Sequence, residues 1–176
     1  MAENIDWPDG LAPEHFKPAG LFPRGANPLP VLGLAALLAT ALSGVLGGGP
    51  GSTYAAESDA AALRVENPAI IRNGEFFETR IDIEAKRPIA ELKLLVDASL
   101  WRGMTQNSMI PQASDETTED ERHVYSFGPL EAGESLLVQI DTQSNPTLLG
   151  STQGSVSVAD GDTELVTLPL SIKVLP

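Results

Sequence analysis

The sequence predicts a mainly β protein, an immunoglobulin-like β-sandwich carried on a single transmembrane α-helix, with an irregular N-terminal tail. Three observations support this prediction. The first residues are rich in proline, residues 29–46 have no charged side chain in a chain with 11 basic and 24 acidic residues, and short alternating segments between turn residues follow. The predicted divisions are a tail over 1–27, a helix over 28–47, a linker over 48–60 and the sandwich over 61–176.

The tail has too few apolar residues to fold on its own. Residues 1–27 contain four prolines and no helical period, and such a composition cannot bury enough apolar surface to offset the entropy of ordering. Its large apolar side chains are therefore the predicted contacts with a partner protein, because aromatic anchors dominate protein interfaces. These side chains are Trp7, Phe16, Leu21 and Phe22.

The uncharged segment is predicted to be a retained transmembrane helix. Its 18 residues, Leu29 to Leu46, make a helix of about 27 Å, against roughly 30 Å for the hydrocarbon core of a bilayer. A cleaved secretory signal is the first alternative, since small residues follow at Ala55 and Ala56. It is disfavoured because the 28 preceding residues carry four acids and two bases, whereas a signal begins with a short basic region. A buried core helix is the second alternative, and the flanking prolines and glycines disfavour it.

The basic residues predict the orientation of this segment. Lys17 and Arg24 precede it, and no further base occurs before Arg64. The positive-inside rule therefore places the N-terminus in the cytoplasm and residues 61–176 in the periplasm, with the helix in a bacterial inner membrane.

Small residues recur along the segment at spacings of three and four. They are Gly33, Ala36, Thr40 and Gly44, and such a stripe lets helix backbones approach closely in lipid. We therefore expect contacts with other integral membrane subunits of a complex. The segment has no titratable side chain, so no proton path or cofactor ligand is predicted within it.

The remaining residues read as short strands. Residues 77–85 alternate strictly between apolar and charged side chains, which is typical of a half-buried strand. Turn signals such as Asn73-Gly74 separate the segments, and about seven short strands are typical of an immunoglobulin-like sandwich. The further predicted strands are 62–66, 91–97, 123–127, 135–142, 154–159 and 164–174.

Two stretches carry a resemblance to a known family. Residues 67–75 lead into the charged alternating strand, and Phe127-Gly128-Pro129-Leu130-Glu131-Ala132-Gly133-Glu134-Ser135 forms an acidic glycine turn before a later strand. With the terminal Val174-Leu175-Pro176, residues 61–176 resemble the CARDB-type immunoglobulin-like domains of bacterial surface and membrane proteins. The resemblance implies an adhesion or assembly module without a common active site.

The residue types exclude most catalytic and metal chemistry. The chain has no cysteine, and His123 is the one histidine outside the tail, so zinc, haem and iron–sulfur ligand sets are incomplete. His123 is predicted to be a surface residue of a strand. The acidic loop 114–121 lacks the glycine that a calcium loop needs, and is predicted to be solvated or to face a partner. No metal, cofactor or enzyme activity is expected.

Residues 101–111 are predicted to be a long irregular connection with interface character. Trp101, Met104 and Met109 are the candidate contacts, since Trp and Met are enriched at interfaces. For Trp101 the core tryptophan of the sandwich is the favoured interpretation, because such sandwiches often bury one, and an interface contact is the alternative.

The net charge of the chain restricts the class of partner it can bind. The net charge of −13 argues against nucleic acid or anionic lipid as the main partner and suits docking of a basic soluble protein.

The tail, helix and exterior domain together look like a non-catalytic accessory subunit of a bacterial energy-transducing membrane complex, such as a photosynthetic reaction centre with its light-harvesting or other electron-transfer partners. The alternative is a membrane-anchored periplasmic or surface module for binding or adhesion.

Overall fold

The computed structural model describes residues 8–12, 27–47, 49 and 51–176 of the chain. The chain divides into two compact units, residues 1–38 and 39–176, with helix α1 (Leu29–Leu42) crossing the boundary between them. The four apolar residues predicted as tail anchors, Trp7, Phe16, Leu21 and Phe22, lie outside the described residues.

Helix α1 is shorter than the sequence predicts. It has 14 residues, or about 21 Å, and none of the helices that the structure describes is both long and apolar enough to cross a membrane. The expected transmembrane helix over 28–47 is therefore not supported. The reason lies at its C-terminal end, where the Ser43 hydroxyl donates to the Thr40 carbonyl at 2.7 Å and Gly44 and Gly47 adopt φ of 73° and 91°. This left-handed backbone conformation ends a helix.

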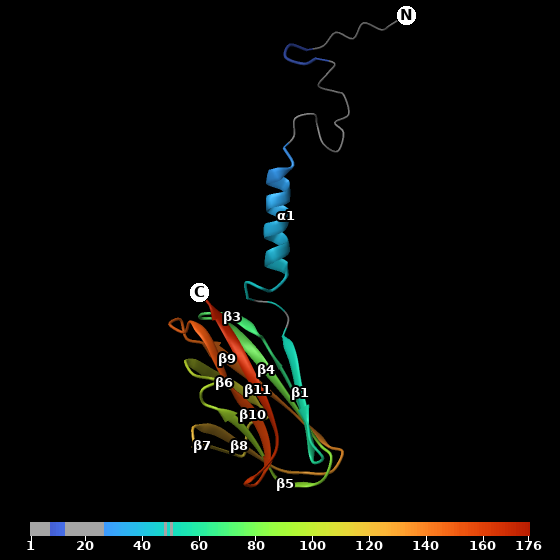
Figure 1. The fold of residues 1–176 in the computed structure, drawn as a ribbon, viewed down its shortest axis with the longest axis vertical. Coiled ribbons are helices and arrows are strands. Elements are labelled where there is room, and N and C mark those ends of the chain that lie inside the picture. The colour runs from blue at the N-terminus through green and yellow to red at the C-terminus, as the bar shows by residue number, and fades with distance from the viewer. Residues whose placement is uncertain (1–7, 13–26, 48, 50) are drawn as a thin grey trace, which may run out of the picture. The chain divides into compact units, whose positions relative to one another are not determined.

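In the described residues, eleven strands form two sheets, drawn in Figure 1. The five-stranded sheet has the order β1 (Ser52–Glu57), β2 (Ala61–Asn67), β4 (Phe76–Ala85), β9 (Ser135–Ser144), β6 (Met104–Ile110). The six-stranded sheet has the order β3 (Ile70–Arg72), β11 (Thr163–Leu175), β10 (Gly150–Asp160), β5 (Ile89–Asp97), β8 (Arg122–Leu130), β7 (Asp115–Glu119). The paired strands are antiparallel except β3 and β11. The prediction of a mainly β, immunoglobulin-like sandwich of two sheets is confirmed.

The core lies between the sheets and follows the predicted alternation. On β4, Ile81 and Ile83 are fully buried while Arg80 and Asp82 are exposed, and Ile81 pairs with Val65 of β2 and Val138 of β9. Burial of large aliphatic side chains stabilises by roughly 1.5–3 kcal/mol each, so this face supplies much of the stability of the sandwich. The seven predicted strands are all present, as β2, β4, β5, β8, β9, β10 and β11.

Four strands were not predicted from the sequence. β1 lies in the residues predicted as linker, and β3 has three residues. β6 occupies the segment predicted to be irregular. Its sequence does not look like a strand, because a bulge at Asn107 shifts its register on β9 and breaks the alternation. β7 replaces the predicted acidic loop, and its five residues are all exposed. A tight turn joins β7 to β8, with Asp120 and Glu121 at φ of 48° and 61°, as in the hairpin turns that suit the twist of two strands.

Candidate functional site

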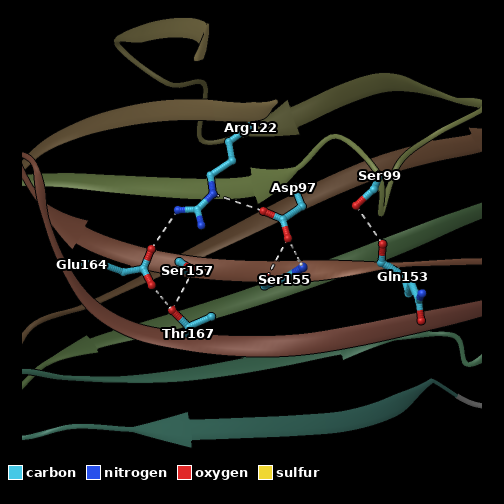
Figure 2. A network of polar contacts seen from close by, with 8 residues as sticks. All are labelled: Asp97, Ser99, Arg122, Gln153, Ser155, Ser157, Glu164 and Thr167. Carbon is cyan, nitrogen blue, oxygen red and sulfur yellow. Dashed lines mark hydrogen bonds and ion pairs between the residues drawn. The ribbon is translucent and has the colours of Figure 1, made fainter. Parts of the chain in front are cut away.

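One candidate site is a chain of polar contacts across the six-stranded sheet (Figure 2). Arg122 of β8 is central, with Nη1 at 2.8 Å from a Glu164 carboxylate oxygen and Nε at 3.3 Å from Oδ1 of Asp97. The other oxygen of Asp97 accepts from the backbone N–H of Ser155 at 2.8 Å and from its hydroxyl at 2.7 Å. These contacts join β5, β8, β10 and β11.

The other end of the chain is closed by hydroxyl groups. Thr167 donates to Glu164, and the hydroxyls of Ser157 and Thr167 lie 2.9 Å apart. The hydrogen bond from Thr167, with a further contribution from Arg122, lowers the pKa of the Glu164 carboxyl, although burial opposes the shift. Each charged group in Figure 2 has an opposite charge beside it and each hydroxyl has a partner, so the network fastens four strands together rather than presenting a reactive group.

The second candidate is a cavity of about 330 Å³ at the edge where β6 and β7 are the outer strands of their sheets. We call it the open-edge cavity. Its wall comes from both sheets and from the turn after β5. The lining residues are Trp101, Met104, Gln106, Glu116, His123, Tyr125 and Thr142.

Strand register explains why these side chains meet. Glu116 pairs with Tyr125 and Thr118 pairs with His123, so all four lie on the same face of the six-stranded sheet. That face points inward, because Tyr125 is 1% exposed and belongs to the core. Elsewhere the inward positions of the sheets are mostly apolar. At this edge the inward positions hold the carboxylate of Glu116, the imidazole of His123 and the hydroxyl of Thr118.

Aromatic rings form one part of the cavity wall. The centroid of the Trp101 ring lies 5.9 Å from that of His123 and 6.3 Å from that of Tyr125, both pairs tilted. The Tyr125 hydroxyl donates to Oε1 of Gln106 on β6 at 2.7 Å and so joins the two sheets. Burial raises the pKa of the Tyr125 phenol, and the negative charge of Glu116 raises it further. Tyr125 therefore stays a neutral hydrogen-bond donor.

Thr142 of β9 contributes an unsatisfied polar group to the same cavity. It is 2% exposed, and its hydroxyl oxygen has no hydrogen-bond partner in the part of the chain that the structure describes. A buried polar atom without a partner costs about 1–3 kcal/mol. The open-edge cavity thus carries an unmet hydrogen-bonding capacity.

The structure brings together only some of the residues predicted from the sequence. Trp101 and Met104 line the open-edge cavity, and Trp101 is 9% exposed and part of the core, as its favoured interpretation predicts. Met109 packs partly buried against the core. Of the small residues of the predicted stripe, Gly33, Ala36 and Thr40 lie exposed on α1, and Gly44 lies beyond its end. Contacts of these residues with partner subunits stay predictions.

Several lining residues were missed or misplaced by the sequence analysis. His123, predicted to be a surface residue of a strand, is half-buried on β8, and its ring centroid lies 5.9 Å from that of Trp101. Gln106 and Glu116 fall within the predicted interface segment 101–111 and the predicted acidic loop 114–121 without being named individually, and Thr142 falls within the predicted strand 135–142. The alternation of His123, Tyr125 and Phe127 was an available signal, since it places the three side chains on one face of a strand. Among the described residues, no group of three or more potential ligands could hold a metal ion.

Comparison with known proteins gives structural neighbours at low sequence identity. No family model matches the chain, so the expected CARDB-type resemblance is not confirmed, and no curated protein matches it. CaCohA2 from Clostridium acetobutylicum is 15% identical with a TM-score of 0.45, covering 66% of this chain and 92% of its own. A non-cellulosomal cohesin from Archaeoglobus fulgidus is 13% identical with a TM-score of 0.41, covering 72% and 92%. The chitin-binding domain of a Pyrococcus furiosus chitinase is 9% identical with a TM-score of 0.35, covering 65% and 97%.

Proposed function

We propose that this protein is a non-catalytic binding module whose β-sandwich recognises a ligand in the open-edge cavity. The observation that carries the proposal is the unpartnered, buried hydroxyl of Thr142 in a cavity lined by aromatic rings and polar groups. A ligand that supplies the missing partner recovers the cost of that group, which favours the bound state. Concave sites with aromatic walls and a few convergent polar groups are the usual form of binding sites.

This proposal corresponds to the alternative of the two functions predicted from the sequence. The accessory subunit of an electron-transfer complex depends on partner contacts made by the tail and by a spanning helix. The tail anchors lie outside the described residues, and the spanning helix is not supported. The cavity, in contrast, is formed entirely by described residues of one compact unit.

We further propose that the apolar helix α1 attaches the sandwich to a membrane. No side chain of α1 is buried, and its large apolar groups are between 54% and 86% exposed, as for Leu38 and Leu42. An apolar patch of this kind marks a surface that associates with lipid or protein. The cytoplasmic N-terminus and the periplasmic position of the sandwich stay predictions.

The binding function can be tested without knowing the ligand. The chain has two tryptophans, Trp7 and Trp101, so incorporation of 5-fluorotryptophan gives two fluorine signals, which Trp101→Phe assigns. We expect at least one class in a mixed library of peptides, oligosaccharides and small metabolites to shift the Trp101 signal and leave that of Trp7 unchanged. A library that shifts neither signal, or both equally, would contradict the proposed function.

A further inference from the structure

We propose that the open-edge cavity receives a lysine or arginine side chain from an extended, basic polypeptide partner. This inference rests on the proposed function and names the ligand. Three properties lead to it: the kind of hydrogen-bonding atoms in the cavity wall, the charge of β7 and the turn after it, and the size of the cavity.

Several groups in the wall can accept a hydrogen bond. The Glu116 carboxylate accepts only, and the Thr142 hydroxyl oxygen has no partner among the described residues. Oε1 of Gln106 already accepts from Tyr125 and retains a second lone pair. Ammonium and guanidinium groups are donors with no acceptor, so they complement this set of atoms.

The rings provide a second reason for a cation. The ring centroid of Trp101 lies 5.9 Å from that of His123 and 6.3 Å from that of Tyr125. A cation within about 6 Å of a tryptophan or tyrosine face is attracted by the ring electrons, and more strongly where water is excluded.

The segment that forms β7 and the turn after it carries charge of one sign. The residues from Asp115 to Glu121 hold five carboxylates and no base. Arg122 follows them, but its guanidinium is engaged by Asp97 and Glu164 on the opposite face of the sheet. The resulting negative potential concentrates cations at the cavity and speeds their association.

Size and position favour one side chain of a polypeptide over a large ligand. The volume of about 330 Å³ is near the lower limit of ligand clefts, which run from roughly 300 to 1,000 Å³. The cavity opens beside β7, an outer strand that hydrogen-bonds to β8 on one side only within the described sheet. An outer strand offers backbone N–H and C=O groups to an extended chain. An incoming peptide can therefore pair with β7 and place a basic side chain in the cavity.

The test uses the full-length chain and synthetic peptides. A short peptide whose only charged side chain is a central arginine is titrated by calorimetry and by the Trp101 fluorine signal. The matched control replaces arginine by citrulline, which keeps the shape and lacks the charge. We expect the arginine peptide and its lysine counterpart to bind, and the citrulline peptide to bind at least about tenfold more weakly, because charge-assisted hydrogen bonds are lost.

Two substitutions on β7 separate the cavity from general charge attraction. Glu116→Gln removes the carboxylate that lines the cavity, whereas Glu119→Gln removes the same charge from the outward face of the strand. We expect Glu116→Gln to weaken binding about tenfold or more and Glu119→Gln to change it by less than about twofold. Thr142→Val is a third variant, which should weaken binding while the free protein remains as stable as before or becomes more stable.

The outcomes distinguish this inference from the proposed function. Equal binding of arginine and citrulline peptides, or equal effects of Glu116→Gln and Glu119→Gln, would overturn the inference. If another class of compound shifts the Trp101 signal and basic peptides do not, the inference fails and the binding function stands. If ethylguanidinium or putrescine binds as tightly as the peptides, the polypeptide partner is wrong. A library without any hit overturns both.

Discussion

The substitution Gly154→Ala tests how closely β10 approaches the turn that carries Trp101. A Cβ atom at position 154 would lie 2.9 Å from Cβ of Asp97, 3.0 Å from Cβ of Leu100 and 3.0 Å from the Ser99 hydroxyl oxygen. Two of these atoms are attached directly to the backbone, so rotation of a side chain cannot move them away. The turn itself is held by hydrogen bonds, including one from the Ser99 hydroxyl to the Gln153 carbonyl at 2.8 Å, drawn in Figure 2.

The expected free-energy change has two opposing contributions. Overpacking of a closely packed site costs about 1–3 kcal/mol, since the backbone has to move by several tenths of an ångström. Alanine reduces the entropy of the unfolded chain and stabilises by about 0.4–1 kcal/mol. The net expectation is a loss of about 1–2 kcal/mol in the free energy of unfolding.

Urea unfolding followed by circular dichroism measures this loss, with Gly51→Ala as the matched control. A Cβ atom at Gly51 would meet its nearest neighbour, a backbone atom of Asn67, at 3.9 Å, which is an ordinary contact. We also expect Gly154→Ala to shift the fluorine signal of Trp101, because the displaced turn leads directly into that residue. Equal stabilities of the two variants would refute the reasoning from close approach.

Two further predictions concern the polar network and the apolar helix. The pKa of Glu164 lies below its ordinary value of 4.5, so its contribution to folding is complete above that pH and is lost as the pH falls through the lowered pKa. Glu164→Gln should therefore flatten the decline of unfolding free energy on acidification below pH 4.5, and an unchanged slope in urea titrations would contradict this. Replacing both Leu34 and Leu38 by lysine should move the protein from the detergent phase to the aqueous phase in cloud-point partition, since a lysine in an apolar helix costs roughly 2.5–3.5 kcal/mol for transfer into lipid. Leu137→Lys, at a leucine of β9 that is 49% exposed, is the control, and a doubly substituted protein that remains in the detergent phase would exclude α1 as the attachment.

Period-2 patterning in the sequence was enough to predict the sandwich core. Residues 77–85 alternate between apolar and charged side chains, and β4 buries the apolar set, because a strand with one solvated face must alternate. The same reasoning found the seven strands that have a clear alternation. It missed β6, where the bulge at Asn107 reverses which face each side chain occupies, and β7, whose inward positions are polar.

The length of α1 shows a different limit. A run without charge predicts an apolar segment, and every large apolar side chain that the structure describes in α1 is indeed exposed rather than in the core. The run does not show where the helix ends. That depends on Ser43 and on the backbone conformation of Gly44, which local propensity allows but does not require.

By itself, the sequence determined the mainly β class, the main strands and an excess of negative charge. Only the tertiary structure decided the candidate site. Trp101, Glu116 and Thr142 lie on three separate segments, and each has an ordinary local environment along the chain. They meet because β6 and β7 are the outer strands of two facing sheets, and the order of strands in a sheet is set by long-range pairing rather than by any local pattern.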